Sequence, residues 1–103
     1  MTLEELKERC EKAGFKYAYG LFKKPTKPPH LVAFQTATDN FFADNLVYEK
    51  DKPIQLDYTY ADKNEEEQNK IENEILGDIA WNKTEEVYLQ DEGVWQVSYF
   101  FEL

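Results

Sequence analysis

Apolar and polar residues alternate regularly along residues 53–60, PIQLDYTY. Ile54, Leu56, Tyr58 and Tyr60 fall on one side of an extended chain, and mostly polar residues lie between them. A period of two residues is typical of a strand that buries one face. The pattern therefore predicts a half-buried strand over this segment.

The alternation stops after residue 60, and a helical pattern follows it. We expect Asp62 to be the N-cap, because Glu65 stands three residues later, as a capping box requires. Gly77 is predicted to end the helix in a left-handed conformation. The first turn carries Glu65, Glu66 and Glu67, and the narrow apolar stripe consists of Ile71, Ile75 and Leu76. A strand that runs into a helix is thus the central local prediction.

A second capping box, formed by Thr2 and Glu5, predicts an N-terminal helix over residues 3–13 that ends at Gly14. Its apolar residues at helical spacing are Leu3, Leu6, Cys10 and Ala13. We expect Cys10 to be a small buried hydrophobe, because nothing in the sequence indicates a cationic or metal environment that would lower the pKa of its thiol.

The remaining strands are shorter or less regular. They are predicted over residues 15–22, 30–37, 46–50, 79–83, 86–90 and 94–103. The unbroken apolar run in residues 30–37 indicates burial on both faces. We expect residues 46–50 to form a hairpin with the strand at 53–60. A turn with Gly93 at a positive φ should join the last two strands into a terminal hairpin.

The last strand is predicted to have two distinct faces. Trp95, Val97, Tyr99 and Phe101 share one of them, and Val94, Gln96, Ser98 and Phe100 share the other. We expect this strand to be at least half buried, because apolar residues occur on both faces.

The chain has 103 residues, of which 42% are hydrophobic, so we expect one domain over residues 1–103. The order of elements is α-β-β-β-α-β-β, with an extra short strand possible before the proline-rich segment. This order predicts an α+β fold, with a mostly antiparallel sheet of about five to six strands and both helices on one face. The opposite face should be more polar, or covered by a neighbour.

The net charge of −9 argues against a protein that binds nucleic acid sequence-specifically, because phosphate contacts need clustered Lys and Arg. The charge is uneven. Residues 12–38 contain five lysines and no acidic residue, whereas residues 39–103 contain seventeen acidic residues and five lysines. One interpretation is chance segregation on a solvated surface. The other is a subunit with one basic and one acidic flank, suited to head-to-tail contact with copies of itself.

We find no residue pattern that indicates catalysis, so we expect no enzyme activity and no cofactor. His30 is the only histidine, and it follows two prolines at a strand start, where a surface or packing role is commoner than metal ligation. The pairs Asp39–Asn40 and Asp44–Asn45 can offer oxygen ligands to calcium, but turn formation explains them better. No apolar run is long enough for a membrane span, and the acidic start does not resemble a signal peptide.

Interaction with other proteins is what these residues favour. Phe41 and Phe42, flanked by the turn-forming residues Asp39 and Asp44, are candidate contacts, although both rings can instead pack into the core. Pro28 and Pro29 lie in a stiff polar connector, KKPTKPPH, and are further candidates. A Pro-x-x-Pro ligand from Pro25 and Pro28 and strand addition at the terminal strand are two other modes.

Several segments resemble the small tail-terminator (tail-completion) proteins of siphophages and prophages of Gram-positive bacteria. Those proteins have a proline segment before a strand, an "SDNF-ADN-VY" stretch, a strand with "ELYT", a glutamate-rich helix and a final hairpin with an acidic-glycine turn. The resemblance covers nearly the whole chain. The corresponding residues here are Thr38-Asp39-Asn40-Phe41, Ala43-Asp44-Asn45, Val47-Tyr48 and Leu56-Asp57-Tyr58-Thr59.

The resemblance implies a virion structural protein with a compact α+β fold. Such proteins cap the tail tube as a ring, commonly a hexamer, and join it to the head-connector (stopper) protein. The partners would be copies of itself, the tail-tube protein and the connector, with DNA passing through the ring. The implied location is the bacterial host cytoplasm during assembly and then the virion tail. The alternatives are a neck or head-closure adaptor of similar fold and, less in keeping with these residues, a small enzyme or regulator.

The two phenylalanines give a direct mutational test. Replacing them together, Phe41→Ser with Phe42→Ser, should leave folding intact and abolish assembly if the rings face a partner. Circular dichroism measures folding and light scattering measures assembly. Unfolding of the double variant would assign both side chains to the core instead.

Overall fold

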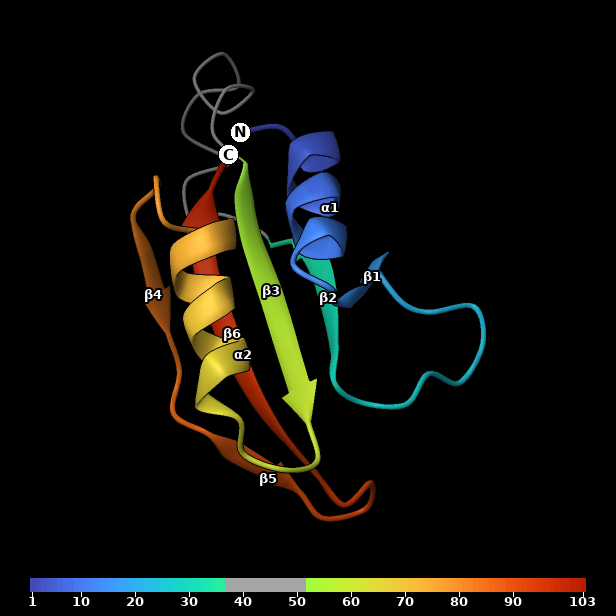
Figure 1. Ribbon diagram of the computed structural model, residues 1–103. Coiled ribbons are helices and arrows are strands. Elements are labelled where there is room, and N and C mark those ends of the chain that lie inside the picture. Colours follow the sequence, from blue (N-terminus) through green and yellow to red (C-terminus); the bar gives the residue numbers. More distant parts are fainter. Residues whose placement is uncertain (37–51) are drawn as a thin grey trace, which may run out of the picture.

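The computed structural model describes residues 1–36 and 52–103, which form one α+β unit of helices packed on a sheet (Figure 1). The predicted fold class is confirmed. The predicted strand at 46–50 and its hairpin lie outside the described residues. The elements are α1 (Leu3–Lys12), β1 (Lys16–Tyr19), β2 (His30–Gln35), β3 (Pro53–Tyr60), α2 (Glu65–Lys70), the π-helix η1 (Ile71–Ile75), β4 (Trp81–Lys83), β5 (Val87–Leu89) and β6 (Val94–Glu102).

The sheet has the strand order β1-β2-β3-β6-β4, and β5 also pairs with β6. Four of the strand pairs in the described residues are antiparallel, and β1 pairs with β2 in parallel. The sequence predicted the short extended segment but not its direction. The direction follows from the connector at residues 20–29, which returns the chain to the end at which β1 began (Figure 1). β1 therefore forms one edge of the sheet.

One face of the sheet carries the core, and α1, α2 and η1 cover that face (Figure 1). In β3 the predicted alternation holds, because Ile54, Leu56, Tyr58 and Tyr60 are all buried. On the uncovered face, Asp57 accepts hydrogen bonds from Ser98 Oγ at 2.6 Å and from Gln55 Nε2 at 2.8 Å. The expectation of a more polar second face is confirmed.

Three tyrosines of the core place their hydroxyl groups against carboxylates at the edge of the helical layer. A buried hydroxyl without a partner is costly, so each of these rings needs an acceptor. Burial, reinforced by the neighbouring carboxylate, raises the pKa of all three phenols. The acceptors are Glu67 for Tyr58 (2.6 Å), Glu86 for Tyr60, and Glu72 for Tyr99 (2.8 Å).

Lysines complete two of these contacts. Lys63 Nζ lies 2.5 Å from Glu86, and Lys83 Nζ lies 2.7 Å from Glu72. Each of these glutamates thus bonds a core tyrosine on one side and a surface lysine on the other. Some of the acidic residues after β3 therefore accept hydrogen bonds from tyrosines of the core. Those in the first turn of α2 also favour the start of that helix through the helix dipole.

The N-cap of α2 is Asn64, and the prediction of Asp62 is wrong. The Asn64 side chain accepts a hydrogen bond from the backbone N–H of Glu67 at 3.2 Å. Aspartate and asparagine are comparable N-caps, so local preference does not distinguish them. The hydrogen bond from Tyr58 to Glu67 fixes the position of the first turn of α2. Asn64 lies three residues before Glu67, at the position from which an N-cap side chain reaches the Glu67 N–H.

After Lys70 the helix widens into η1, whose last bond joins Leu76 N to Ile71 O at 3.0 Å, five residues apart. An α-helix would turn Leu76 away from Ile71 and Ile75, because its period is 3.6 residues. The wider turn lets all three side chains of the predicted stripe become fully buried.

Gly77 follows this widened turn, but it does not have the positive φ that we predicted; Gly14 and Gly93 do, as expected. Its role is close approach. A Cβ atom at position 77 would lie 2.1 Å from the carbonyl oxygen of Asn73. Only glycine fits against the last turn of η1 without a shift of the backbone.

The predicted N-terminal helix is confirmed as α1. Thr2 is its N-cap and accepts from the N–H of Glu5 at 3.1 Å. Cys10 is fully buried, and burial raises the pKa of its thiol to about 12, so it behaves as a hydrophobe. Arg9 bonds both carboxylate oxygens of Asp78, at 2.7 and 3.0 Å, and the carbonyl of Ile75 at 3.0 Å. This contact ties α1 to the end of η1.

The prediction that residues 30–37 are buried on both faces is wrong. In β2, Leu31 and Ala33 are buried, but Val32 is only half-buried, because the helices cover one face alone. In β6, the face with Val97, Tyr99 and Phe101 is the buried one. Trp95 is exposed, because it lies beyond the helical cover at the end of the strand, and Val94 is buried instead.

The close approach at Gly77 predicts a large effect of a small substitution. Gly77→Ala should reduce the free energy of unfolding by about 1–3 kcal/mol, because the backbone must move to admit the methyl group. Urea denaturation measures the change. Glu74→Ala, an exposed position on the same helix, is the control and should change stability by less than about 0.5 kcal/mol. Equal stability of the two variants would contradict the assigned role.

Candidate interaction surface

The two edges of the sheet differ in how they are built. β1 is short and forms one edge, followed directly by the connector at residues 20–29. The other edge consists of β4 and β5, which pair with successive parts of β6. Edge strands carry backbone groups without a strand neighbour, so they are common places for contact between chains. The side chains near the two edges decide what each one can bind.

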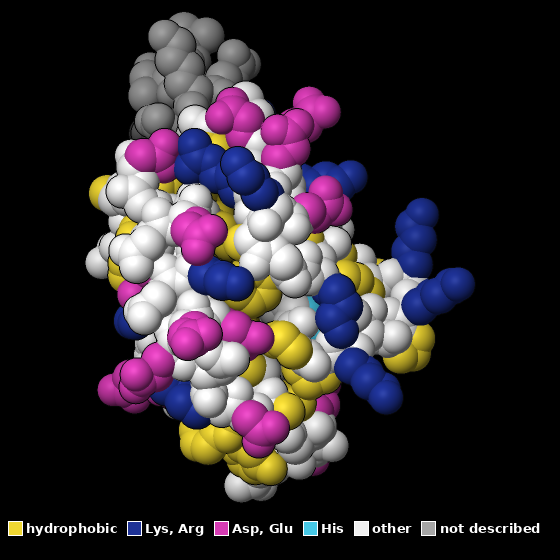
Figure 2. Space-filling view, in the orientation of Figure 1, with side chains coloured by type: hydrophobic (Ala, Val, Ile, Leu, Met, Phe, Trp, Pro, Cys, Tyr) yellow, Lys and Arg dark blue, Asp and Glu magenta, His cyan; other side chains and the backbone are white. Residues whose placement is uncertain are grey.

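The connector edge is basic and has a projecting apolar side chain. Leu21 is 71% exposed, the highest value among the large apolar side chains of the described residues. The lysines of this edge are Lys16, Lys23, Lys24 and Lys27, and dark blue side chains gather over the connector in Figure 2. Lys16 Nζ also donates to the carbonyl of Lys27 at 2.5 Å, which holds the connector beside β1.

The opposite edge combines aromatic and acidic residues. Tyr88 of β5 and Trp95 of β6 are register partners whose ring centroids lie 5.1 Å apart. Tyr88 is 47% exposed and Trp95 is 38% exposed. Glu85 and Asp91, on either side of β5, are exposed. We call these four residues the hairpin surface.

Of the interface candidates from the sequence, the structure describes Pro28 and Pro29. Phe41, Phe42, Asp39 and Asp44 lie outside the described residues. Pro28 and Pro29 are half-buried, with Pro28 on the inner side of the connector. Sequence reasoning missed Leu21, Tyr88 and Trp95. The available signals were a lone leucine beside a lysine-rich segment and an aromatic residue at each end of the Gly93 turn.

A hollow of about 450 Å³ lies between the connector and the uncovered sheet face. Its lining comprises Pro25, Thr26, Pro28, His30, Val32, Asp57, Thr59, Glu92, Val94 and Gln96. Asp57 at its floor is already bonded to Ser98 and Gln55, and Gln96 Nε2 lies 3.5 Å from Thr59 Oγ1. The bonds of Ser98 and Gln96 join β6 to β3, whereas Gln55 and Asp57 both belong to β3, so these polar groups of the floor already bond one another within the sheet.

His30 is the titratable group of this hollow with an altered environment. Its Nδ1 is buried without a hydrogen-bond partner, and its ring packs edge-on against Phe22 at 5.1 Å. Burial lowers the pKa of the imidazole, and the nearby Lys16 lowers it further, whereas Glu92 acts in the opposite direction. We therefore regard His30 as a packing residue that is held neutral, in keeping with the sequence interpretation.

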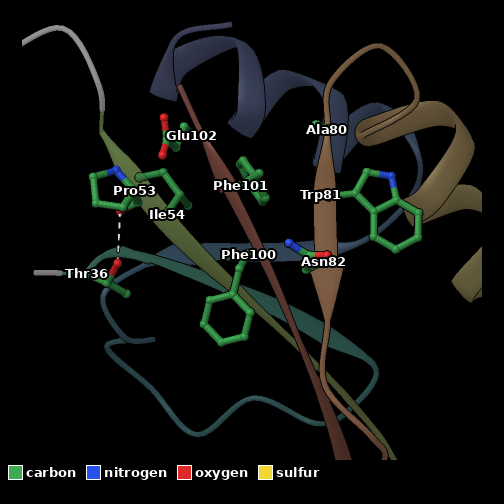
Figure 3. Close-up of a pocket in the computed structure, with 9 residues that line it drawn as sticks. All are labelled: Thr36, Pro53, Ile54, Ala80, Trp81, Asn82, Phe100, Phe101 and Glu102. Atoms are coloured by element: carbon green, nitrogen blue, oxygen red, sulfur yellow. Dashed lines mark hydrogen bonds between the residues drawn. The ribbon is translucent and has the colours of Figure 1, made fainter. Parts of the chain in front are cut away.

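A second hollow of about 450 Å³ lies where β3 begins and β6 ends (Figure 3). The ring of Phe100 gives it an apolar wall, whereas the ring of Trp81 points away from it and packs on Tyr99 (Figure 3). Thr36 Oγ1 lies 3.5 Å from the carbonyl of Pro53. Glu102 is its only ionisable side chain among the described residues. Such a lining is suited to shape recognition and offers no pair of groups for proton transfer.

Nowhere in the two described ranges do three or more His, Cys, Asp or Glu side chains gather closely enough to hold a metal ion. None of the helices in residues 1–36 and 52–103 is both long and apolar enough to cross a membrane.

Comparison with known proteins does not assign the chain to a family. No family model, no curated protein and no solved structure matches it significantly. Its function must therefore be argued from its own residues and from the resemblance of its motifs.

The single histidine allows a direct test of the environment beside the connector. An NMR titration should give His30 a pKa below the ordinary value of 6.5. Because the unfolded chain then takes up the proton first, the stability contributed by neutral His30 is lost as pH falls from about 6.5 through the folded pKa, and it is unaffected at higher pH. His30→Gln should lack this step. A folded-state pKa above 6.5 would contradict the packing described here.

Proposed function

We propose that this chain is a tail-terminator subunit of a siphophage or prophage. In this role, copies assemble head to tail into a ring that caps the tail tube and joins it to the head connector. The proposal starts from the motif resemblance, which covers nearly the whole chain. The compact α+β fold is compatible with it.

The observation that carries the proposal is the opposite charge of the two sheet edges. The connector edge has four lysines, whereas residues 61–103, which form α2, η1 and the strands β4, β5 and β6, contain twelve acidic residues and three lysines. A head-to-tail ring joins two different surfaces of the same subunit. Surfaces of opposite charge attract each other and disfavour the symmetric pairings that would end the ring early.

The charge of the assembled ring also suits passage of DNA. Lysines in the contacts between subunits would be neutralised there, which leaves the excess of acidic residues on the free surfaces. A negatively charged lumen repels the phosphate backbone, so DNA would pass without adhering. The net charge of −9 per subunit supports this part of the proposal.

The second candidate is a neck or head-closure adaptor. The same edges would then contact a different protein, and the apolar hollow of Figure 3 would be a further docking place. The unequal edges favour the ring, since both of its contact surfaces are then present in one chain.

Binding to tail tubes tests the proposal. The purified protein, mixed with tubes of the tail-tube protein encoded in the same genome, should form rings at tube ends in negative-stain electron micrographs. Tubes already capped in mature virions are the control and should bind none. Binding to connector assemblies alone would favour the adaptor. Absence of binding to both would contradict a role in the tail.

A further inference from the structure

We infer that the connector of one copy docks on the hairpin surface of the next copy, with Leu21 seated against Tyr88 and Trp95. This inference rests on the proposed function and names the contact that would close its ring. The connector surface is defined by Leu21, Lys23, Lys24 and Lys27. The hairpin surface is the one defined above.

The apolar parts of the two surfaces fit each other. A leucine that is 71% exposed loses contact with water when it meets an apolar partner. Tyr88 and Trp95 offer a half-exposed pair of rings, tilted at 57°, to which the helical cover does not extend. Aromatic residues of this kind are the commonest anchors of protein interfaces.

The charged parts are complementary as well. Lys23, Lys24 and Lys27 of the connector and Glu85 and Asp91 of the hairpin form no ion pair among the described residues. Other acids near the hairpin are already committed, because Glu86 bonds Tyr60 and Lys63. The free lysines and the free carboxylates are thus available to a second copy.

Within one copy the two surfaces lie on opposite faces of the sheet. The connector lines a hollow on the uncovered face together with Val94 and Gln96, whereas Tyr88 and Trp95 lie on the face that Tyr60, the register partner of Trp95, shares. The connector extends from the β1 edge, whereas β5 lies on the far side of β3 and β6 (Figure 1). Glu92 does lean toward the connector, where it lines the hollow beside His30, and for this reason we leave it out of the hairpin surface. Each copy therefore keeps one surface of each kind for its two neighbours.

Concentration-dependent NMR spectra of the ¹⁵N-labelled protein at low ionic strength locate the contact. The expected shifts are confined to the connector and the hairpin surface and disappear at high salt. Leu21→Asp and Tyr88→Ser should each weaken self-association at least about tenfold. Val87→Ser is the matched control, because Val87 is 50% exposed but points to the opposite face of β5, and it should leave association unchanged. The dispersion of each spectrum shows that the variant is folded.

A charge exchange separates direct contact from indirect effects. Lys23→Glu with Lys24→Glu makes both surfaces of one variant acidic, and Glu85→Lys with Asp91→Lys makes both surfaces of the other basic. Each variant alone should lose association by about tenfold or more, and an equal mixture should regain it, because every contact then joins unlike charges.

The outcomes distinguish this inference from the proposed function. Shifts that map elsewhere or are absent, a Leu21→Asp variant that associates like the wild type, or a mixture that stays dissociated overturns the docking. Rings on tube ends together with any of these results would leave the tail-terminator role standing. The mapped contact without tube binding would uphold the docking and remove the proposed function.

Discussion

Hydrogen bonds from three buried tyrosine hydroxyls to three glutamates tie the border of the core together, and two of them join the sheet to its helical layer. Tyr58 and Tyr60 belong to β3 and Tyr99 to β6, and the acceptors come from α2, η1 and the bend between β4 and β5. The rings fill the core while their hydroxyls reach its border, where an acceptor must be present. The buried tyrosines of the sheet therefore require carboxylates on the side of the molecule that lies over β3, β6 and β4.

This requirement also shapes the charge of the surface. Three glutamates bond core tyrosines on the side of the molecule over β3, β6 and β4, whereas the lysines of the connector lie beyond β1. Lys63 and Lys83 form ion pairs with only two of these three glutamates, Glu86 and Glu72. The uneven charge along the sequence thus becomes an uneven charge across the sheet, which is the basis for the proposed contact between copies.

Much of the fold was predictable because local patterns determine it. The alternation in β3, the N-cap of α1 at Thr2 and the turn at Gly93 each depend on residues close in sequence, and the structure has all three. The errors occur where the local sequence allows two outcomes equally well and a tertiary contact decides between them. Asn64 rather than Asp62 caps α2 because Glu67 must meet Tyr58, and Gly77 serves close approach because η1 widens.

The candidate surface was less predictable, since it depends on topology. Leu21 and the Tyr88–Trp95 pair become notable only once β1 and β5 are known to form opposite edges and the helices are known to stop short of Trp95. Alternation groups Trp95 with Val97, Tyr99 and Phe101, and these three residues are buried while Trp95 is not. Burial also requires another element packed over the side chain, and the sequence pattern of a single strand does not indicate whether one is present.

Zero-length cross-linking between copies tests the central claim most directly, namely that the basic edge of one copy meets the acidic edge of another. Carbodiimide treatment of an equal mixture of light and ¹⁵N-labelled protein, followed by mass spectrometry, identifies the mixed-isotope peptides that join two copies. We predict amide bonds from Lys23, Lys24 or Lys27 to Glu85 or Asp91. Mixed-isotope links that instead join these lysines to the acidic residues of α1, or the absence of links between copies, would contradict the account.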